Sequence, residues 1–310
     1  MTMKSIKQYF LFAATALLLG ACSSEDLGES LIDTSTPTLN ETDLWIRQHY
    51  TTPYNVEVKY RWDNSELDNT KVLTPPYEED VVPFLEQMSN IWIEPYLRQG
   101  GETFVKTHIP KLIVLVGSHN MQSDGSIVLG QAEGGRKVTI FDLNYISFDF
   151  EGLNEYEKEQ QLNKIIGTFQ TMHHEFAHIL HQTVAYPVEY KKITPGYVRN
   201  WMNYSTSEAR RMGFITSYAM LNPDEDFAEM VSEMLTTSRE KWNKTIDDIK
   251  IYDANWDVDE TASAKVRANL RDKEKMIADY MAGTWNIDIY ALQTDIMEAI
   301  GKLTETTNEE

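Results

Sequence analysis

The chain has 310 residues and a formal net charge of −20, because 48 acidic residues outnumber 28 basic ones. A chain this acidic argues against nucleic acid and anionic lipid headgroups as partners, since both carry negative charge. The single cysteine, Cys22, excludes a disulfide within the chain and a zinc site built from cysteines.

The first 21 residues have the composition of an export signal. Two lysines precede an apolar run that ends at Ala21 and is shorter than the roughly 20 residues needed to span a bilayer. The segment LLGAC, residues 18–22, resembles the bacterial lipobox, in which cleavage before the cysteine leaves that residue acylated. We therefore predict a lipoprotein signal peptide at residues 1–21 and lipidation of Cys22. An ordinary signal peptide cleaved near Ala21 is the alternative.

Residues 22–41 are polar and acidic, with few apolar side chains to bury, which predicts a flexible tether. Acidic residues soon after the cysteine resemble the surface-export signal of Bacteroidetes lipoproteins, although a solvated linker would have the same composition. The expected location is the outer membrane, on the cell surface, with the lipid anchor as the only contact with the membrane. Residues 42–310 are numerous enough for one large domain, or for two intimate subdomains, with a sizeable core.

The first part of this domain predicts a small mixed sheet. Residues 55–62 alternate between apolar and polar side chains as a half-buried strand does. KLIVLVGS, residues 111–118, is a compact apolar run that is typical of a central strand. SIVLGQ and KVTIFDL, residues 126–131 and 137–143, flank a turn-forming segment and predict a hairpin or a sheet edge.

Helical patterns surround and follow these strands. They cover residues 41–50, then residues 78–99 up to the pair Gly100 and Gly101, and then most of the chain after Asn154. A loop is expected at residues 185–200, and residues 285–303 predict a short connection that leads into a final helix. The expected fold class is α+β, with a small mixed sheet followed by a mainly helical C-terminal part.

The histidines gather on one predicted helix. Four of the seven lie between residues 173 and 181, and HEFAH, residues 174–178, fits the pattern H-E-x-x-H. In this pattern two imidazoles one helical turn apart bind one zinc ion, and the glutamate reaches the water on it. Chance would give roughly 0.01 such matches in a chain of this composition. His174, His178 and His181 also lie opposite an apolar stripe formed by Ile165, Phe169, Met172, Phe176, Ile179 and Leu180.

A catalytic zinc ion needs a third protein ligand. His181 lies about 10 Å along the helix axis from His174, too far to share one ion, and no histidine follows it. A carboxylate is therefore expected, and residues 213–235 are the best source, with Asn222 and Pro223 starting a helix. Glu225 and Glu229 lie one turn apart on that helix, so one can bind zinc while the other orients a ligand histidine. The alternative is that these acids only cap and solvate the helix.

HEFAHILHQ followed by GFITSYAMLNPDEDFAE resembles the gluzincin metallopeptidases. The chain is most similar to the substrate import-associated zinc metallohydrolase lipoproteins of Bacteroidetes, which are typically encoded beside TonB-dependent outer-membrane receptors. An E-x-F-A-E pattern with a tyrosine seven residues before its first glutamate also resembles the peptidase domain of anthrax lethal factor. The resemblance implies a zincin-like fold with an active-site helix, zinc as cofactor, and these roles: zinc ligands His174, His178 and Glu225, general base Glu175, oxyanion donor Tyr218, and Glu229 behind the ligands.

Some assignments stay open within this interpretation. Asp226 is the rival third ligand, and His181 either supports a ligand or lines the cleft. In zincins an edge strand of the sheet pairs with an extended substrate, and KVTIFDL is the candidate by its order in the chain.

The predicted function is a zinc peptidase that acts on a peptide or protein substrate. Zinc lowers the pKa of its water, Glu175 takes the proton and later passes it to the leaving amine, and Tyr218 helps to stabilise the oxyanion. One alternative is a zinc hydrolase of non-peptide substrates. Another is a surface binding subunit of a TonB-dependent uptake system, with the receptor and its surface lipoprotein as partners. An intact Glu175 argues against a purely structural zinc site, since such a site needs no base.

Overall fold

The computed structural model describes residues 38–122, 125, 127–133 and 135–305. The predicted signal peptide, Cys22 and almost all of the predicted tether lie outside the described residues. The domain forms one unit from Asn40 onward. Its first helix, α2 (Glu41–Ile46), starts at Asn40, whose side chain accepts a hydrogen bond from the Asp43 backbone N–H.

A four-stranded mixed sheet has the strand order β1-β2-β6-β5. Its strands are β1 (Glu57–Lys59), β2 (Leu112–Leu115), β5 (Gly130–Glu133) and β6 (Lys137–Ile140). β1, β2 and β6 run parallel, whereas β5 pairs antiparallel with β6. The predicted central position of KLIVLVGS is therefore confirmed. The segment SIVLGQ divides between β5 and a separate two-stranded sheet, formed by β3 (Asn120–Met121) and β4 (Ile127–Val128).

The prediction that KVTIFDL forms the edge strand is wrong. β6 lies between β2 and β5, so both of its edges are paired, and β5 is the strand at the edge. Three of the four residues of β6 are buried, whereas those of β5 alternate between half-buried and exposed. The order of two strands in a hairpin does not say which one lies outside. The stronger apolar character of β6 was the available signal, because a strand paired on both sides is the more buried one.

The helices on either side of β1 in the chain are longer than predicted. α4 (Glu78–Met88) passes through a π-helical turn, Ser89–Ile93, into α5 (Glu94–His108). The predicted end at Gly100 and Gly101 is only an interruption, in which Gly101 adopts a φ of 82°. The chain then resumes as a helix, because Phe104 and Val105 bury their side chains in the core. α3 (Thr52–Tyr54) is a single turn that follows α2 through a second π-helical turn.

The rest of the chain is helical, as predicted. α6 (Glu155–Thr183) begins at a capping box on Asn154. The expected loop at residues 185–200 contains only the short helix α7 (Tyr190–Ile193). It is followed by α8 (Thr206–Arg211), α9 (Pro223–Leu235), α10 (Arg239–Asp247), α11 (Glu260–Trp285) and α12 (Ile289–Glu305). Among the described residues, no helix is long and apolar enough to cross a bilayer.

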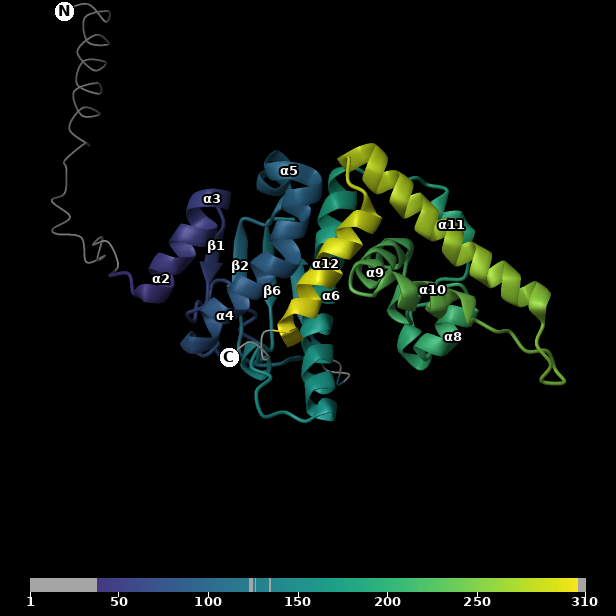
Figure 1. The fold of residues 1–310 in the computed structure, drawn as a ribbon, viewed down its shortest axis with the longest axis horizontal. Coiled ribbons are helices and arrows are strands. Elements are labelled where there is room, and N and C mark those ends of the chain that lie inside the picture. The colour runs from purple at the N-terminus through teal and green to yellow at the C-terminus, as the bar shows by residue number, and fades with distance from the viewer. Residues whose placement is uncertain (1–37, 123–124, 126, 134, 306–310) are drawn as a thin grey trace, which may run out of the picture. The chain divides into compact units, whose positions relative to one another are not determined.

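α6 stands between the two parts of the domain. Figure 1 shows the sheet and the first helices on one side of α6, and the helices from α8 to α11 on the other. All six residues of the predicted apolar stripe are buried, which confirms the orientation of the helix. Phe169 of the stripe stacks on Phe84, and Phe176 contacts Trp92 edge to face. This packing anchors one face of α6 and leaves its opposite face, which carries the histidines, for α9 and β5.

Candidate metal centre

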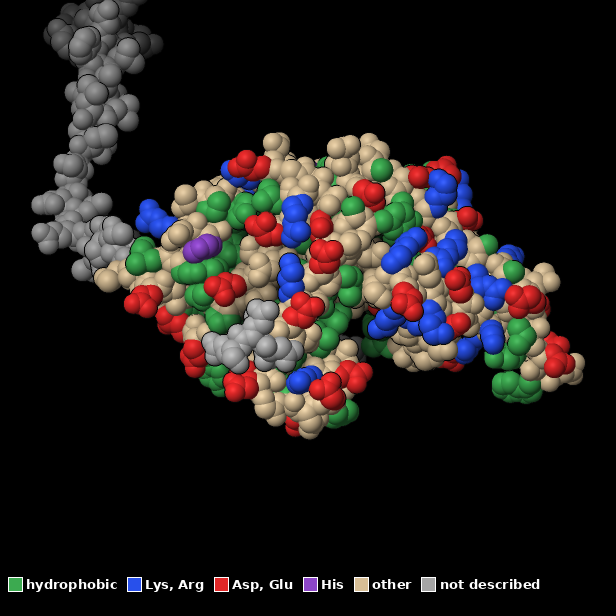
Figure 2. Space-filling model, in the orientation of Figure 1, with side chains coloured by type: hydrophobic (Ala, Val, Ile, Leu, Met, Phe, Trp, Pro, Cys, Tyr) green, Lys and Arg blue, Asp and Glu red, His purple; other side chains and the backbone are tan. Residues whose placement is uncertain are grey.

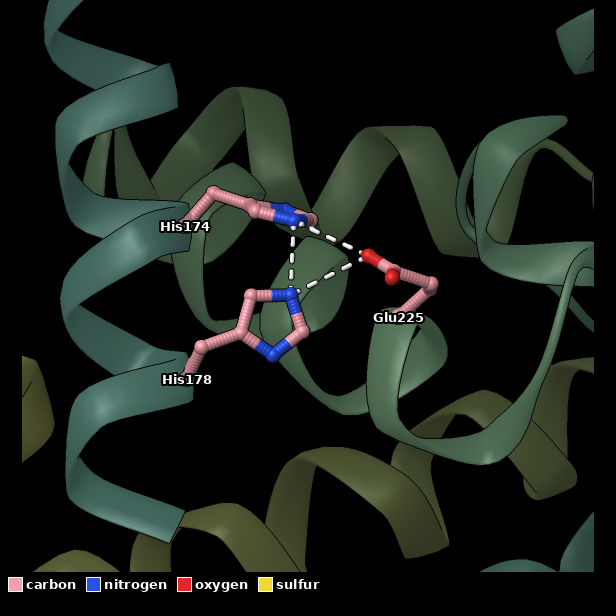
Figure 3. Close-up of side chains that lie close together, drawn as sticks. All are labelled: His174, His178 and Glu225. Carbon is pink, nitrogen blue, oxygen red and sulfur yellow. Dashed lines mark hydrogen bonds and ion pairs between the residues drawn. The ribbon is translucent and has the colours of Figure 1, made fainter. Parts of the chain in front are cut away.

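The two histidines of the H-E-x-x-H pattern meet a glutamate from α9. Figure 3 shows His174 and His178 projecting from α6 toward Glu225. Oε2 of Glu225 lies 3.1 Å from Nε2 of each imidazole, and the two Nε2 atoms are 3.0 Å apart. One ligand atom from each of the three residues lies within 4.8 Å of the other two, as binding one ion requires. Two imidazoles and one carboxylate suit zinc and leave a fourth position for water.

The start of α9 fixes the position of Glu225. The side chain of Asn222 accepts hydrogen bonds from the backbone N–H groups of Asp224 and Glu225, at 2.9 and 3.0 Å. Pro223 occupies the first turn, where its missing N–H costs nothing. The helix dipole also favours a carboxylate at this end. The sequence signals that start the helix therefore also hold the backbone of the third candidate ligand.

The charges of the cluster favour a cation. Burial alone would raise the pKa of Glu225, but hydrogen bonds with His174 and His178 hold that pKa well below its usual range. Burial would likewise lower the pKa of His174, yet its contacts with Glu225 and Glu229 prevail and raise it to about 10. Carboxylates that stabilise a proton on a buried imidazole also stabilise a divalent cation at the same place. The donor set and its electrostatics thus fit zinc.

Each imidazole is held on the side that faces away from Glu225. Nδ1 of His174 lies 2.8 Å from Oε1 of Glu229, whose other oxygen accepts a hydrogen bond from the Thr216 hydroxyl. Nδ1 of His178 lies 2.8 Å from Nε2 of the buried His181. Burial and the charge of His178 lower the pKa of His181 to about 4, so His181 is neutral at neutral pH and can accept a hydrogen bond. Both contacts favour the tautomer with Nε2 free to bind a metal.

Glu175 lies between this cluster and the edge of the sheet. Its Oε2 accepts a hydrogen bond of 3.0 Å from the backbone N–H of Ala132 in β5. Since β5 has no further neighbour in the sheet, this N–H belongs to the free edge of the strand. The carboxylate is thus close to the histidines of its own helix and also to the strand that borders the cleft.

The cleft consists of two adjoining hollows that meet at His174, Glu175 and Tyr218. The side chains of Ile127, Leu129 and Trp201 make one hollow largely apolar. Three amides, Gln122, Gln131 and Gln182, make the other polar. The ring centroid of Tyr218 is 5.8 Å from that of His174, and its ring packs edge to face on Trp201 at 4.9 Å. Tyr218 thus lies at the cleft, beside the histidines and Glu225.

Asp226, the rival third ligand, is directed elsewhere. Its Oδ2 lies 2.6 Å from Nζ of Lys273 in α11, and both side chains are fully buried. The Tyr197 hydroxyl donates a second hydrogen bond to Oδ2, at 2.9 Å. Lys273 also donates to the backbone carbonyl of Gly213, at 2.9 Å. The structure therefore brings Glu225, and not Asp226, to the two imidazoles.

Several residues around the candidate metal centre could not be predicted from the sequence. Thr216, Ala132 and Trp201 carry no motif, and each reaches the site only through tertiary contacts. The buried Lys273 lies in a helix whose sequence suggests ordinary packing. Asn222 is the exception, because an asparagine directly before a proline and three acids is a recognisable helix start.

Two histidines and one carboxylate beside an open cleft, in a mixed α+β fold, define a metal-dependent hydrolase. The profile of a family described as "Putative zinc-binding metallo-peptidase" matches residues 35–290, so the chain belongs to that family and zinc is its cofactor. The chain is also similar to a solved structure described as "a putative zinc-binding metallo-peptidase" from Bacteroides caccae ATCC 43185. The two share 32% identity with a TM-score of 0.68, over 89% of this chain and 97% of the other. No curated protein sequence matches.

Proposed function

We propose that this chain is a zincin-like peptidase of the gluzincin type, which hydrolyses peptide bonds with a zinc-activated water. The observation that carries the proposal is the position of Glu175. Its carboxylate lies beside His174, His178 and Glu225 and also reaches the free edge of β5. A site that only stored or structurally bound zinc would gain nothing from a carboxylate placed between the ligands and a cleft.

The residues of the site take distinct roles in this reaction. Zinc, when bound by His174, His178 and Glu225, supplies a Lewis acid that polarises a carbonyl and activates a water. Glu175 takes a proton from the attacking water and passes it to the leaving amine. Tyr218 donates a hydrogen bond to the carbonyl oxygen as negative charge develops there. Burial and the charge of Glu225 raise the pKa of Tyr218, so its hydroxyl remains a donor at neutral pH.

The free edge of β5 is the proposed binding site for the substrate backbone. An extended peptide can add to an unpaired strand through main-chain hydrogen bonds, with alternate side chains entering pockets beside it. The N–H of Ala132 is directed toward the cleft, and the side chains around it form an apolar and a polar hollow. Main-chain pairing of this kind suits a peptide better than a substrate without a regular backbone.

We also propose that Cys22 carries lipid and anchors the chain in the outer membrane, facing outward, beside a TonB-dependent receptor that imports the products. The lipobox-like LLGAC segment and the resemblance to import-associated lipoproteins support this location. Cys22→Ser in the full chain should move the protein from the membrane fraction to the soluble fraction. Retention of the variant in the membrane fraction would contradict lipid anchoring.

The peptidase proposal is tested with a Glu175→Gln variant of residues 23–310 loaded with zinc. We expect cleavage of a peptide library, scored by mass spectrometry, to fall by about 10² to 10⁴, while the zinc content stays the same. Glu159→Gln, an exposed change on the same helix, is the matched control and should keep full activity. Cleavage that survives Glu175→Gln would contradict the proposed role of this residue. Cleavage of esters or glycan-linked amides in place of peptides would move the substrate to another class.

A further inference from the structure

A second cavity, lined by cationic side chains, lies among α8, α10 and the segment that follows α10. Five bases line it, namely Arg210, Arg211, Lys241, Lys244 and Lys250, together with the single carboxylate of Asp248. Figure 2 shows Lys and Arg side chains gathered over α8, α10 and α11. The cavity shares no lining residue with either hollow of the metal cleft. It is thus a distinct feature, and its character is opposite to the net charge of the chain.

Most bases of this cavity lack the carboxylate partners that neighbouring bases have. Arg271, for example, pairs with Asp247 and Glu274, at 3.1 and 2.7 Å. Among the described residues, Lys244 is the only base of the cavity with an ion pair, to Asp248 at 2.6 Å. In the part of the chain that the structure describes, four bases without an ion pair surround this hollow and repel one another, and nearby acids such as Glu208 and Glu233 offset the repulsion only in part. A bound anion would remove that repulsion.

Two guanidinium groups are already oriented at this cavity. Nε of Arg210 donates to the backbone carbonyl of Ile215 at 3.0 Å, which fixes the plane of the group and leaves its two terminal nitrogens available. One terminal nitrogen of Arg211 donates to the Ser207 hydroxyl, also at 3.0 Å. A fixed guanidinium presents two parallel N–H donors, which match two oxygens of an oxyanion. Orientation before binding lowers the entropic cost of holding a ligand.

Glu233, a half-buried acid that interacts with two of these bases, has another hydrogen-bond partner. Burial raises the pKa of Glu233, and the charges of Arg210 and Lys241 oppose this only in part. The carboxylate of Glu233 accepts a hydrogen bond from Gln170 of α6 at 2.8 Å. It therefore belongs to the packing between α6 and α9, and it does not line the cavity.

We propose that this cavity binds the phosphate group of a soluble phosphate ester or of a lipid headgroup. A phosphate offers three acceptor oxygens and up to two negative charges, and so can meet bases that converge from α8, α10 and the segment after α10. A carboxylate has two oxygens in one plane and would be satisfied by a single arginine. The net charge of −20 repels anions at long range, but salt screens that field beyond about 10 Å, so the local bases decide. The site does not depend on zinc or on peptide hydrolysis.

The test is calorimetric titration of the zinc-loaded 23–310 protein with glucose 6-phosphate, with glucose as the uncharged comparison. The variant Arg211→Gln/Lys241→Gln removes two exposed bases of the cavity. The control Lys106→Gln/Lys158→Gln makes the same change of charge on α5 and α6. Sedimentation with phosphatidylglycerol vesicles, compared with phosphatidylcholine vesicles, tests the lipid source. Thermal melting shows that each variant is folded.

We expect one molecule of glucose 6-phosphate per chain, with binding at least tenfold weaker in the cavity variant, unchanged in the control, and no binding of glucose. Binding to phosphatidylglycerol vesicles that glucose 6-phosphate displaces, and that the cavity variant weakens, would identify a lipid headgroup as the source. Saturable binding of the sugar phosphate without vesicle binding would identify a soluble ester. No saturable binding in either assay, or equal weakening in both variants, would overturn the proposal.

Discussion

Oε1 of Glu229 lies 2.8 Å from Nδ1 of His174, on the side of the ring that faces away from Glu225. This contact belongs to a series of polar contacts between α6 and α9. Glu225 contacts His178, Glu229 contacts His174, and Glu233 contacts Gln170. The residue numbers rise by four along α9 while they fall by four along α6, so the two helices run in opposite directions. Two helices that pack antiparallel therefore bring together the candidate ligand set and a contact that can orient it.

Glu229→Gln should weaken zinc binding about tenfold, because it removes the charge that holds the Nδ1 proton of His174 while nearly preserving the side-chain shape. Competition with a chromophoric chelator measures the zinc affinity. Glu233→Gln is the matched control, since Glu233 meets an amide in place of an imidazole, and it should change the affinity less than twofold. Equal affinities in the two variants would mean that Glu229 does not support the ligand.

Zinc binding should release protons well above the usual titration range of histidine. Contacts with Glu225 and Glu229 raise the pKa of His174 to about 10 against the opposing effect of burial, so His174 is protonated at pH 8 in the metal-free protein. A metal can bind only the deprotonated nitrogen, so about one proton must leave. Titration calorimetry in buffers of different ionisation enthalpy counts that proton. A release near zero at pH 8 would show that His174 titrates near its ordinary value.

The same shift predicts how the stability of the metal-free protein depends on pH. A group whose pKa is higher in the folded state stabilises that state fully below its unfolded pKa, which is 6.5 for His174. The contribution declines above pH 6.5 and is lost as the pH passes about 10. The melting temperature of chelator-treated protein should therefore fall between pH 6.5 and 10. His174→Gln should flatten this dependence, and an unchanged slope in the variant would contradict it.

The sequence was sufficient to predict the parts of the site that local periodicity encodes. The apolar stripe of α6 fixes which face carries His174 and His178, and the spacing of Glu225 and Glu229 places both on one face of α9. Local pattern does not encode which distant segments meet. The outer position of β5 depends on how the hairpin docks on β2, a pairing between residues far apart in the chain.

Asp226 illustrates for a single side chain that local sequence pattern does not encode contacts with distant segments. From the sequence it stays a rival of Glu225 as third ligand, because both lie in the acidic first turn of α9. Its actual partner, Lys273, is 47 positions later and carries no signal of burial. One residue along a helix turns the side chain by about 100°, so Glu225 faces α6 while Asp226 faces α11. Only the packing of three helices decides between the two acids.

Lys273→Met should destabilise the fold without removing a zinc ligand. It leaves the carboxylate of Asp226 buried without its cation, a change that typically costs about 3–5 kcal/mol of the free energy of unfolding. Chemical denaturation of the zinc-loaded protein measures the loss. The double variant Lys273→Met/Asp226→Leu should recover part of it, because no buried charge remains. No recovery in the double variant would mean that lost packing, and not the unpaired charge, accounts for the effect.

The zinc content of two variants tests directly whether Glu225 or Asp226 is the third zinc ligand. Asp226→Ala should keep about one zinc ion in the folded fraction, whereas Glu225→Ala should bind zinc at least tenfold more weakly, because Glu225 contacts both imidazoles and Asp226 contacts neither. Elemental analysis of the purified, folded fraction measures both. Equal retention of zinc in the two variants would place the third ligand elsewhere.

The apolar hollow of the cleft should select the side chain of the substrate. Gly167 lies on α6 at the floor of this hollow, and a Cβ atom added there would meet only a methyl group of Leu129, at 4.0 Å. Gly167→Leu should therefore fold normally and fill the hollow with its side chain. We expect cleavage next to bulky apolar residues to fall about tenfold relative to cleavage next to alanine, since removal of a few methylene contacts has an effect of that size.

Library cleavage scored by mass spectrometry measures this preference, and zinc content should not change, because Gly167 precedes His174 by two helical turns. Gly283→Leu on α11 is the matched control, since an added Cβ there meets nothing within 4 Å and the position lies outside the cleft. An unchanged preference in Gly167→Leu would mean that the substrate side chain does not enter the apolar hollow. If the preference changed by the same amount in both variants, the cause would be the addition of a leucine anywhere on the protein and not the filling of the hollow.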